Sequence, residues 1–375
     1  MRWADPLWAK DLALHLEYID DLTLACPTVY ADPFDEDVDL SREPFSRIKF
    51  VELPRPKNHL EALLMLPASI RAMWSAASEN FIVHTGFGSW PISEGLLAAP
   101  IAKLQGKFLI TNVESSFWRS DTTQETWINV MRGASIERLN RLCIRAANLR
   151  FFTSKAYLRD FLPADAPNAY VAPATWIDSS TILDDETAKD DWVKKKNEIQ
   201  LLFAGRLTHE KGVRVVVDAV RKVSREPISV TIIGDGPLKA ECQKLALEEH
   251  SRVVLRDPIP YGTAFFAMLR NYDVVVVPSL SDEQPRIIFD AFSQGIPVLG
   301  SDTGGIREVV DDGVNGRLVA PGNSDALSEI MAWAAHNRPE LKTMGLAALS
   351  KSRRFTHHAM HERRRDIIVR ALEDL

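Results

Sequence analysis

The sequence is poor in cysteine, and its three cysteines, Cys26, Cys143 and Cys242, lie far apart along the chain. An odd, widely spaced set of thiols is not typical of a disulfide framework, and it lacks the paired spacing of a zinc site. We therefore predict that all three are structural, packed as small hydrophobic side chains in a reducing compartment.

Long apolar runs and an excess of positive charge are also missing. No run approaches the roughly 20 apolar residues that span a bilayer, and the early charges Arg2 and Asp5 do not fit a secretory leader. The formal net charge of −6 argues against a nucleic-acid partner. Residues 60–74 are apolar, but Pro67 and Arg71 interrupt them. They could lie on a membrane surface, although we favour a helix of the core.

What is present fits a globular protein of two domains. The chain has 375 residues, of which 46% are hydrophobic and 26% charged. This composition is ordinary for a soluble fold, and the length exceeds that of one common hydrophobic core.

The second half alternates short β-branched runs with helical patterns. Strands are predicted at 199–204, 228–233, 253–255, 273–277 and 297–299, with helices at 213–223 and 238–247. This alternation is typical of a parallel sheet covered by helices on both faces. The unbroken run of four valines at 274–277 suits a strand that is buried on both sides.

The first half is less regular but has the same α/β character. Strands are predicted at 22–26, 48–53, 81–84, 107–111, 150–153 and 169–171, and helices at 6–18, 59–76, 95–104, 124–147 and 154–161. A polar stretch at 178–197 is predicted to be a linker and hinge, and residues 355–375 a charged amphipathic helix.

A basic pair follows the predicted strand 199–204. Gly205 allows close backbone approach there, and Arg206 and Lys211 lie on the loop where open α/β sheets bind ligands. Arginine and lysine side chains suit a phosphate group. Taken alone, the loop is better interpreted as a turn with solvated charges.

An acidic pair follows the strand 273–277. Asp282 belongs to the loop and Asp290 to the next helix, eight positions later, and such acids can hold the hydroxyls of a sugar nucleotide. The amides of Arg286 and Ile287 open that helix and could line the phosphates. Together with the basic pair, this arrangement favours a phosphate-containing ligand.

Two glycine motifs follow other strands of the second half. Gly234 begins the turn 234–237, for which a structural role is favoured and a backbone contact to a nucleotide stays open. Gly304 and Gly305 open a helix after the strand 297–299, so that free amides are expected to point outward.

This ordered set of motifs resembles the retaining glycosyltransferases of the GT-B fold, family 4, also described as glycosyl transferases group 1. The resemblance is strong over residues 199–355 and diffuse in the first half. It implies two Rossmann-like domains facing across a cleft, with a C-terminal helix crossing back to the first domain. The implied boundaries are an acceptor-binding domain at 1–177, a linker at 178–197, a nucleotide-sugar-binding domain at 198–354 and the helix at 355–375.

The resemblance also implies roles for individual residues. Arg206 and Lys211 would bind the donor diphosphate, Asp282 the donor hexose, and Asp290 the ribose hydroxyls. The family normally has glutamate at both acidic positions, so the shorter aspartates are a departure. Glu283 is expected either to take over the contact of Asp282 or to remain a solvated loop charge.

The first half departs further from the family pattern. Glu114 stands where such enzymes often have a histidine near the reaction centre, and His84 and Trp118 are candidates for the acceptor side. The usual first strand and its glycine-rich loop have no counterpart before the helix 6–18. We expect either a start further upstream or the loss of that strand.

The function implied is transfer of a hexose from a nucleotide-diphosphate sugar, such as a UDP- or GDP-sugar, to a saccharide or lipid-linked acceptor, with retention. No cofactor and no metal are expected. Asp35 and Asp37 match the Asp-x-Asp pattern of metal-dependent transferases, but no predicted strand precedes them, so a solvated loop is favoured. The family's usual setting is polysaccharide or glycolipid assembly at the cytoplasmic face of the membrane, with peripheral contact. The alternatives are a degenerate nucleotide-sugar-binding protein, a sugar-nucleotide epimerase, or a phosphorylase.

Overall fold

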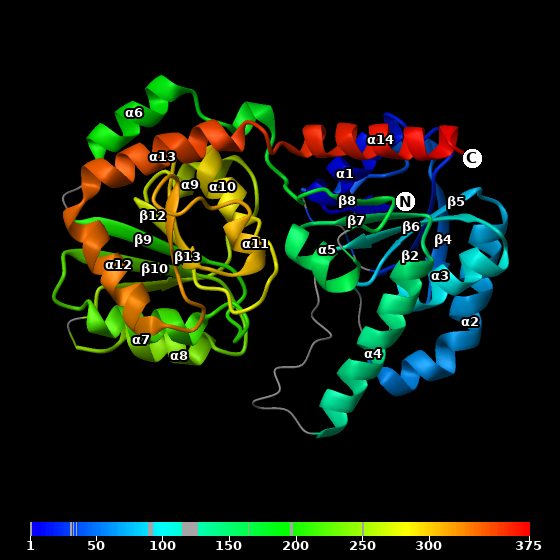
Figure 1. Ribbon diagram of the computed structural model, residues 1–375, viewed down its shortest axis with the longest axis horizontal. Coiled ribbons are helices and arrows are strands. Elements are labelled where there is room, and N and C mark those ends of the chain that lie inside the picture. The colour runs from blue at the N-terminus through cyan, green and yellow to red at the C-terminus, as the bar shows by residue number, and fades with distance from the viewer. Residues whose placement is uncertain are drawn as a thin grey trace. The chain divides into compact units, whose positions relative to one another are not determined.

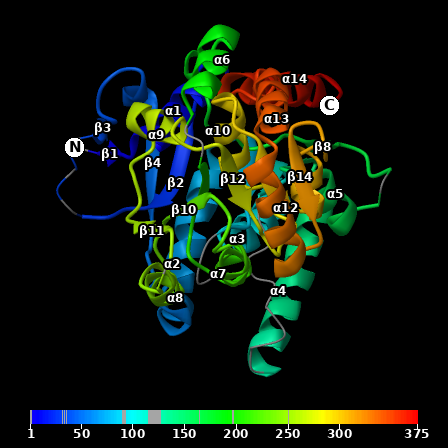
Figure 2. The same ribbon diagram turned by 90° about the vertical axis from the view of Figure 1, so that its left-hand side faces the viewer.

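The computed structural model describes residues 2–375 apart from 31, 33, 35, 89–92, 115–126, 164, 196–197 and 250. Two compact units make up the described chain (Figures 1 and 2). The first contains Met1–Thr153, Tyr157–Ala172 and His361–Leu375, and the second contains Ser154–Ala156 and Pro173–Met360. The chain therefore returns to the first unit for its last residues.

The second unit is built on a six-stranded parallel sheet of order β11-β10-β9-β12-β13-β14. The strands are β9 (Ile199–Ala204), β10 (Ile228–Ile233), β11 (Val253–Arg256), β12 (Val274–Val277), β13 (Val298–Ser301) and β14 (Gly316–Val319). From β9 the chain first builds outward through β10 and β11, and then returns to place β12 on the other side of β9. The boundary between β9 and β12 is thus the point where the strand order reverses, which is where open α/β sheets bind ligands.

Helices cover both faces of this sheet, as the apolar strands predicted. They are α6 (Asp185–Lys194), α7 (Val213–Lys222), α8 (Lys239–Ala246), α9 (Thr263–Leu269), α10 (Ile287–Ser293), α11 (Gly304–Arg307), α12 (Ser324–His336) and α13 (Arg338–Ser352). One core cluster packs Leu201 and Val276 against α7 and α12, and the other packs Leu202 and Val275 against α9 and α10. Alternate residues of each strand therefore enter opposite cores.

The described residues of the first unit form three smaller sheets. β1 (Trp3–Ala4) pairs antiparallel with β3 (Val38–Asp39), β2 (Thr23–Pro27) pairs parallel with β4 (Lys49–Leu53), and β5 (Ile82–Gly86), β6 (Phe108–Val113), β7 (Leu149–Phe152) and β8 (Ala169–Val171) form a parallel sheet in chain order.

Two layers of helices enclose the parallel sheets of the first unit (Figure 1). On one side lie α2 (His59–Ser78), α3 (Gly95–Leu104) and α4 (Trp127–Ala146), which pack on the strands through small residues such as Ala77 and Ala102. On the other side lie α1 (Pro6–Leu16) and the C-terminal part of α14 (His357–Glu373). The short α5 (Lys155–Phe161) packs its aromatic residues beside α4.

The three cysteines are free: Cys242 is buried, and Cys26 and Cys143 are half-buried. None of the described helices is long and apolar enough to cross a bilayer. The expectation of a core helix at residues 60–74 is wrong. Within α2 only Ala62, Met73 and Ala77 are buried, whereas the other apolar side chains remain largely outside the core.

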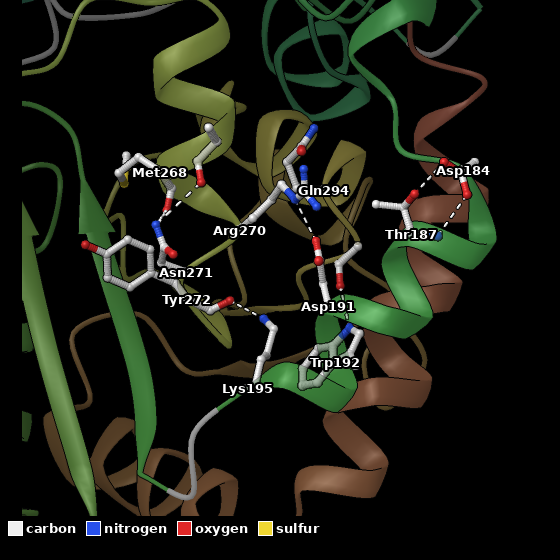
Figure 3. A network of polar contacts seen from close by, with 12 residues as sticks. Asp184, Thr187, Asp191, Trp192, Lys195, Met268, Arg270, Asn271, Tyr272 and Gln294 are labelled. Atoms are coloured by element: carbon white, nitrogen blue, oxygen red, sulfur yellow. Dashed lines mark hydrogen bonds and ion pairs between the residues drawn. The ribbon is translucent and has the colours of Figure 1, made fainter.

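The stretch 178–197 is not the predicted linker, because it belongs to the second unit. Its helix α6 is fastened to the sheet and its helices by several polar contacts (Figure 3). Trp192 is buried and donates through Nε1 to the carbonyl of Gly295 at 3.1 Å. Asp191 accepts from Arg270 Nε at 2.6 Å. The polar composition of this stretch suggested a linker, but the burial of Trp192 holds α6 on the second unit.

Lys195 ends this segment in an unusual environment. Its ammonium group donates to the carbonyl of Tyr272 and lies 3.8 Å from the buried carboxylate of Asp273. Asp273 also accepts from Arg338 at 2.8 Å. Burial, partly offset by Asp273, lowers the pKa of Lys195 from 10.5 to about 8.

This pKa gives a testable dependence of stability on pH. Between about pH 8 and 10.5 the unfolded chain binds more protons at Lys195 than the folded chain, so this residue's contribution to the free energy of unfolding rises with pH. Relative to Lys195→Met, the wild type should gain about 3 kcal/mol across that window. Urea unfolding at several pH values measures the difference, with Lys194→Met as the exposed control. If the difference in free energy of unfolding between the wild type and Lys195→Met did not change with pH, the lowered pKa of Lys195 would be contradicted.

Candidate donor-binding site

The candidate site lies at the carboxyl edge of the second sheet, where β9 and β12 are neighbours. Val274 and Val275 pair with Leu201 and Leu202, so the loops that follow these two strands leave the sheet side by side. The loop after β9 contains Arg206 and Lys211, and the loop after β12 contains Asp282 and Glu283.

Glycine lets these two loops touch. Gly212 has a φ of +72°, and a Cβ atom there would lie 1.9 Å from the carbonyl oxygen of Pro278. Beside this contact, the amide of Leu280 donates to the carbonyl of Glu210 at 2.9 Å. The spacing between the loops thus depends on a residue without a side chain at position 212.

Lys211 and Glu283 form an ion pair across the two loops. Their side chains are only 19% and 17% exposed, so solvent screens the pair weakly. The interpretation of Glu283 as a solvated loop charge is therefore wrong: it is the partner of Lys211. Arg206 differs, since it is 66% exposed and lies 3.8 Å from Glu210.

Asp282 is held by the next strand's loop. Its Oδ1 accepts a hydrogen bond from the amide of Gly304 at 2.7 Å, at the start of α11. A Cβ atom on Gly305 would lie 2.4 Å from the carbonyl of Glu283 and 2.5 Å from that of Asp282. The expectation that the amide of Gly304 is free is wrong, and both glycines permit the close packing of this loop on α11.

Asp290 lies in the first turn of α10 and is 5% exposed. Tyr261 donates its hydroxyl to Asp290 Oδ1 at 2.9 Å. Burial, followed by the charge of Asp290, raises the pKa of Tyr261 well above its usual range, so this tyrosine stays protonated and remains a donor. Tyr261 was not predicted from the sequence; the only signal was an aromatic residue in the loop that follows β11.

The amides of Arg286 and Ile287 come at the start of α10. Among the described residues, neither amide donates to a protein acceptor, and the Arg286 guanidinium lies 5.5 Å from the ring centroid of Trp176. Gly234 has a packing role in its turn, because a Cβ there would lie 1.9 Å from the carbonyl of Gly205. At Gly205 itself a Cβ would meet open space.

Three further polar side chains at this edge of the sheet were not predicted from the sequence as site residues. Thr208 Oγ1, Gln284 Oε1 and Thr303 Oγ1 are buried, and within the described parts of the chain they have no hydrogen-bond partner. They lie on the loops that follow β9, β12 and β13, three neighbouring strands. Buried polar atoms are normally paired, so these atoms indicate where polar groups of a ligand would be bound.

The remaining candidates belong to the sequence of the first unit. Glu114 follows β6, is exposed, and accepts from Asn112 Nδ2 at 2.6 Å. His84 lies in β5 and is exposed. Trp118 lies outside the described residues.

Comparisons with known proteins agree with this architecture. The GT-B fold is shared with a sucrose-phosphate synthase from Thermosynechococcus elongatus, with a TM-score of 0.75 at 17% identity over 98% of this chain and 94% of that one. HepE of Anabaena, solved in complex with UDP-glucose, aligns with a TM-score of 0.68 at 17% identity over 99% of this chain and 97% of that one. The chain is therefore an α/β protein of the GT-B fold, with two Rossmann-like units.

At the level of sequence, residues 184–350 match the family described as glycosyl transferases group 1. A segment of 136 residues is 30% identical to an uncharacterized glycosyltransferase of Methanocaldococcus jannaschii. That match covers 35% of this chain and 34% of the relative's own length. The family match falls within the second unit and includes the loops of the candidate site.

Proposed function

We propose that this chain is a glycosyltransferase whose second unit binds a nucleotide-diphosphate sugar at the edge formed by β9, β12 and β13. The observation that carries the proposal is the set of buried oxygens of Thr208, Gln284 and Thr303, which have no partner among the described residues, together with the largely buried cation Lys211 on the same loop as Thr208. A polar, phosphate-bearing ligand would supply partners for all of them. The match to glycosyl transferases group 1 over residues 184–350 supports this choice of ligand.

In this proposal Lys211 and Arg206 neutralise the diphosphate. Lys211 is paired with Glu283, so an incoming diphosphate competes with that carboxylate. The amides of Arg286 and Ile287 add donors without a charge of their own. Asp282, already held by Gly304, would direct its second oxygen to a hexose hydroxyl.

The proposed reaction transfers a hexose with retention at the anomeric carbon. The bond between that carbon and the diphosphate oxygen breaks with its electrons passing to the diphosphate, and the acceptor oxygen bonds to the same face. The acceptor's proton passes to the departing phosphate oxygen. Lys211 and Arg206 stabilise the charge that develops there, and no cofactor is needed. Glu114, His84 and Trp118 remain proposals for the acceptor side.

Asp290 is proposed to accept hydrogen bonds from the ribose hydroxyls of the donor. Tyr261 donates to one oxygen of this carboxylate, which orients the carboxylate toward the proposed ribose. Asp290→Asn should weaken nucleoside diphosphate binding by about 1–2 kcal/mol and inorganic pyrophosphate binding by much less, because only the nucleoside has a ribose. Isothermal titration calorimetry with UDP, GDP and pyrophosphate measures this. Equal losses for all three would remove Asp290 from the ribose site.

The test of the function begins with a donor panel. Thermal-shift measurements with UDP- and GDP-sugars identify the donor, since a ligand of the folded state raises Tm. NMR of the product formed with a saccharide or lipid-linked acceptor then reports the anomeric configuration. Binding without turnover of any acceptor would favour a degenerate binding protein, and conversion of donor alone would favour an epimerase.

The proposed setting is the cytoplasmic face of a membrane, where such acceptors are assembled, with the chain in peripheral contact. An inverted product configuration would overturn the retaining mechanism while leaving the donor site intact. Failure of every nucleotide sugar to bind would overturn the site itself.

A further inference from the structure

The outward side of α2 carries an exposed apolar stripe. Leu60, Leu63 and Leu64 are 68%, 60% and 73% exposed, and Ile70 and Trp74 follow at 39% and 46%. Positions three and four apart share one side of a helix, so these residues, which we call the α2 stripe, run along its whole length. A surface helix normally exposes its polar side to solvent, whereas α2 exposes an apolar side.

The stripe is not a consequence of loose packing. Met73 and Ala77 of the same helix are buried against β4 and α3, so α2 is anchored in the core by its other side. The outward side is therefore apolar by composition. Glu61 and Arg71 are the only acidic or basic residues, histidine aside, in the twenty residues of α2.

The neighbouring helix α4 extends this surface. Trp127, Met131 and Leu142 are 75%, 61% and 57% exposed. The ends of the two helices are joined by a hydrogen bond between His59 of α2 and Arg132 of α4 at 3.1 Å. Figure 1 shows α2, α3 and α4 together on one side of the strands of the first unit.

This helical layer is basic, although the whole chain has a net charge of −6. Its acidic residues are Glu61 and Glu137. Its basic residues are Arg71, Lys103, Arg132, Arg138, Arg141 and Arg145. Apolar side chains surrounded by cations are typical of a surface that lies on an anionic bilayer.

We infer that the α2–α4 layer of the first unit docks onto an anionic lipid surface, with the α2 stripe inserted among the acyl chains. A second copy of this chain fits less well, because a symmetric contact through this face would bring its arginines together. The inference rests on the proposed function only for its setting. Vesicle binding is measured without donor or acceptor, so its failure and failure of the donor site are distinguishable.

The experiment is flotation of the full chain with vesicles. Phosphatidylcholine vesicles are compared with vesicles of phosphatidylcholine and phosphatidylglycerol, at low and high salt. The test variant is Leu63→Glu with Leu64→Glu. The control is Val193→Glu with Leu247→Glu, which changes one valine and one leucine of the second unit that are 75% and 85% exposed.

The wild type and the control should float with the phosphatidylglycerol vesicles, less so at high salt, and the test variant should lose about tenfold or more in partition coefficient. Arg138→Gln with Arg145→Gln should reduce the preference for anionic over neutral vesicles. All variants should keep the wild-type Tm, since the changed side chains are exposed.

The inference would be overturned if Leu63→Glu with Leu64→Glu bound vesicles as tightly as the wild type does. It would also be overturned if the wild type did not bind vesicles. If analytical ultracentrifugation instead finds a wild-type dimer that the same leucine substitutions dissociate, the surface binds a second copy and the lipid assignment is wrong.

Discussion

Lys211→Ala should weaken binding of UDP, GDP and inorganic pyrophosphate by about 1.5–3 kcal/mol, a loss of roughly 10- to 150-fold in affinity. The side chain is 19% exposed, so its charge acts on a phosphate through little solvent. The substitution removes this cation and leaves Glu283 as an unpaired carboxylate that repels the diphosphate. Isothermal titration calorimetry with the three ligands measures the loss.

Arg206→Ala should weaken binding of the same three ligands by less than about 1 kcal/mol, because this guanidinium is 66% exposed and screened by water. The matched control is Lys222→Ala, which removes a surface lysine paired with Asp325 at 2.6 Å and should leave all three affinities unchanged. Unchanged pyrophosphate affinity in Lys211→Ala would show that the diphosphate does not bind beside β9.

Gly212→Ala should destabilise the protein severely, by more than about 3 kcal/mol. Two costs add at this position. A φ of +72° costs an alanine about 1–2 kcal/mol, and its Cβ would lie 1.9 Å from the carbonyl oxygen of Pro278, a backbone atom that cannot move without separating the two loops of the site. Urea unfolding monitored by circular dichroism measures the change.

Gly313→Ala isolates the first of these costs. Gly313 has a similar φ of +75°, and a Cβ there would meet nothing within 4 Å, so about 1–2 kcal/mol is expected. The difference between the two variants measures the close contact of the loops. Equal destabilisation of both would mean that the loops separate easily. If Gly212→Ala does not fold, the same comparison is made on yields of folded protein.

Much of the fold was predictable because local and tertiary forces agree in the second unit. The strand predicted at 199–204 matches β9, and the run of valines forms β12, buried on both faces. Such strands can be recognised from composition alone. The prediction was wrong at 178–197, where charged residues suggested a linker and the burial of Trp192 holds a helix on the second unit.

The candidate site was predictable as a set of loops but not as a set of contacts. Each loop follows a recognisable strand, so its place at the carboxyl edge follows from the parallel topology. Which groups meet there depends on residues distant in sequence. Glu283 is paired with Lys211, 72 positions away, and Asp290 with Tyr261, 29 positions away. Neither pair has a local signature.

Hydrophobic periodicity and the order of glycine, basic and acidic motifs therefore determined, by themselves, the parallel α/β architecture and the edge at which a ligand would bind. Only the tertiary structure decided which polar groups are already satisfied by the protein and which are buried without a partner. It likewise decided that the apolar residues of α2 face outward. The physical reason is that burial and pairing are properties of the packed chain, and a residue's neighbours across strands and helices cannot be read from its neighbours in sequence.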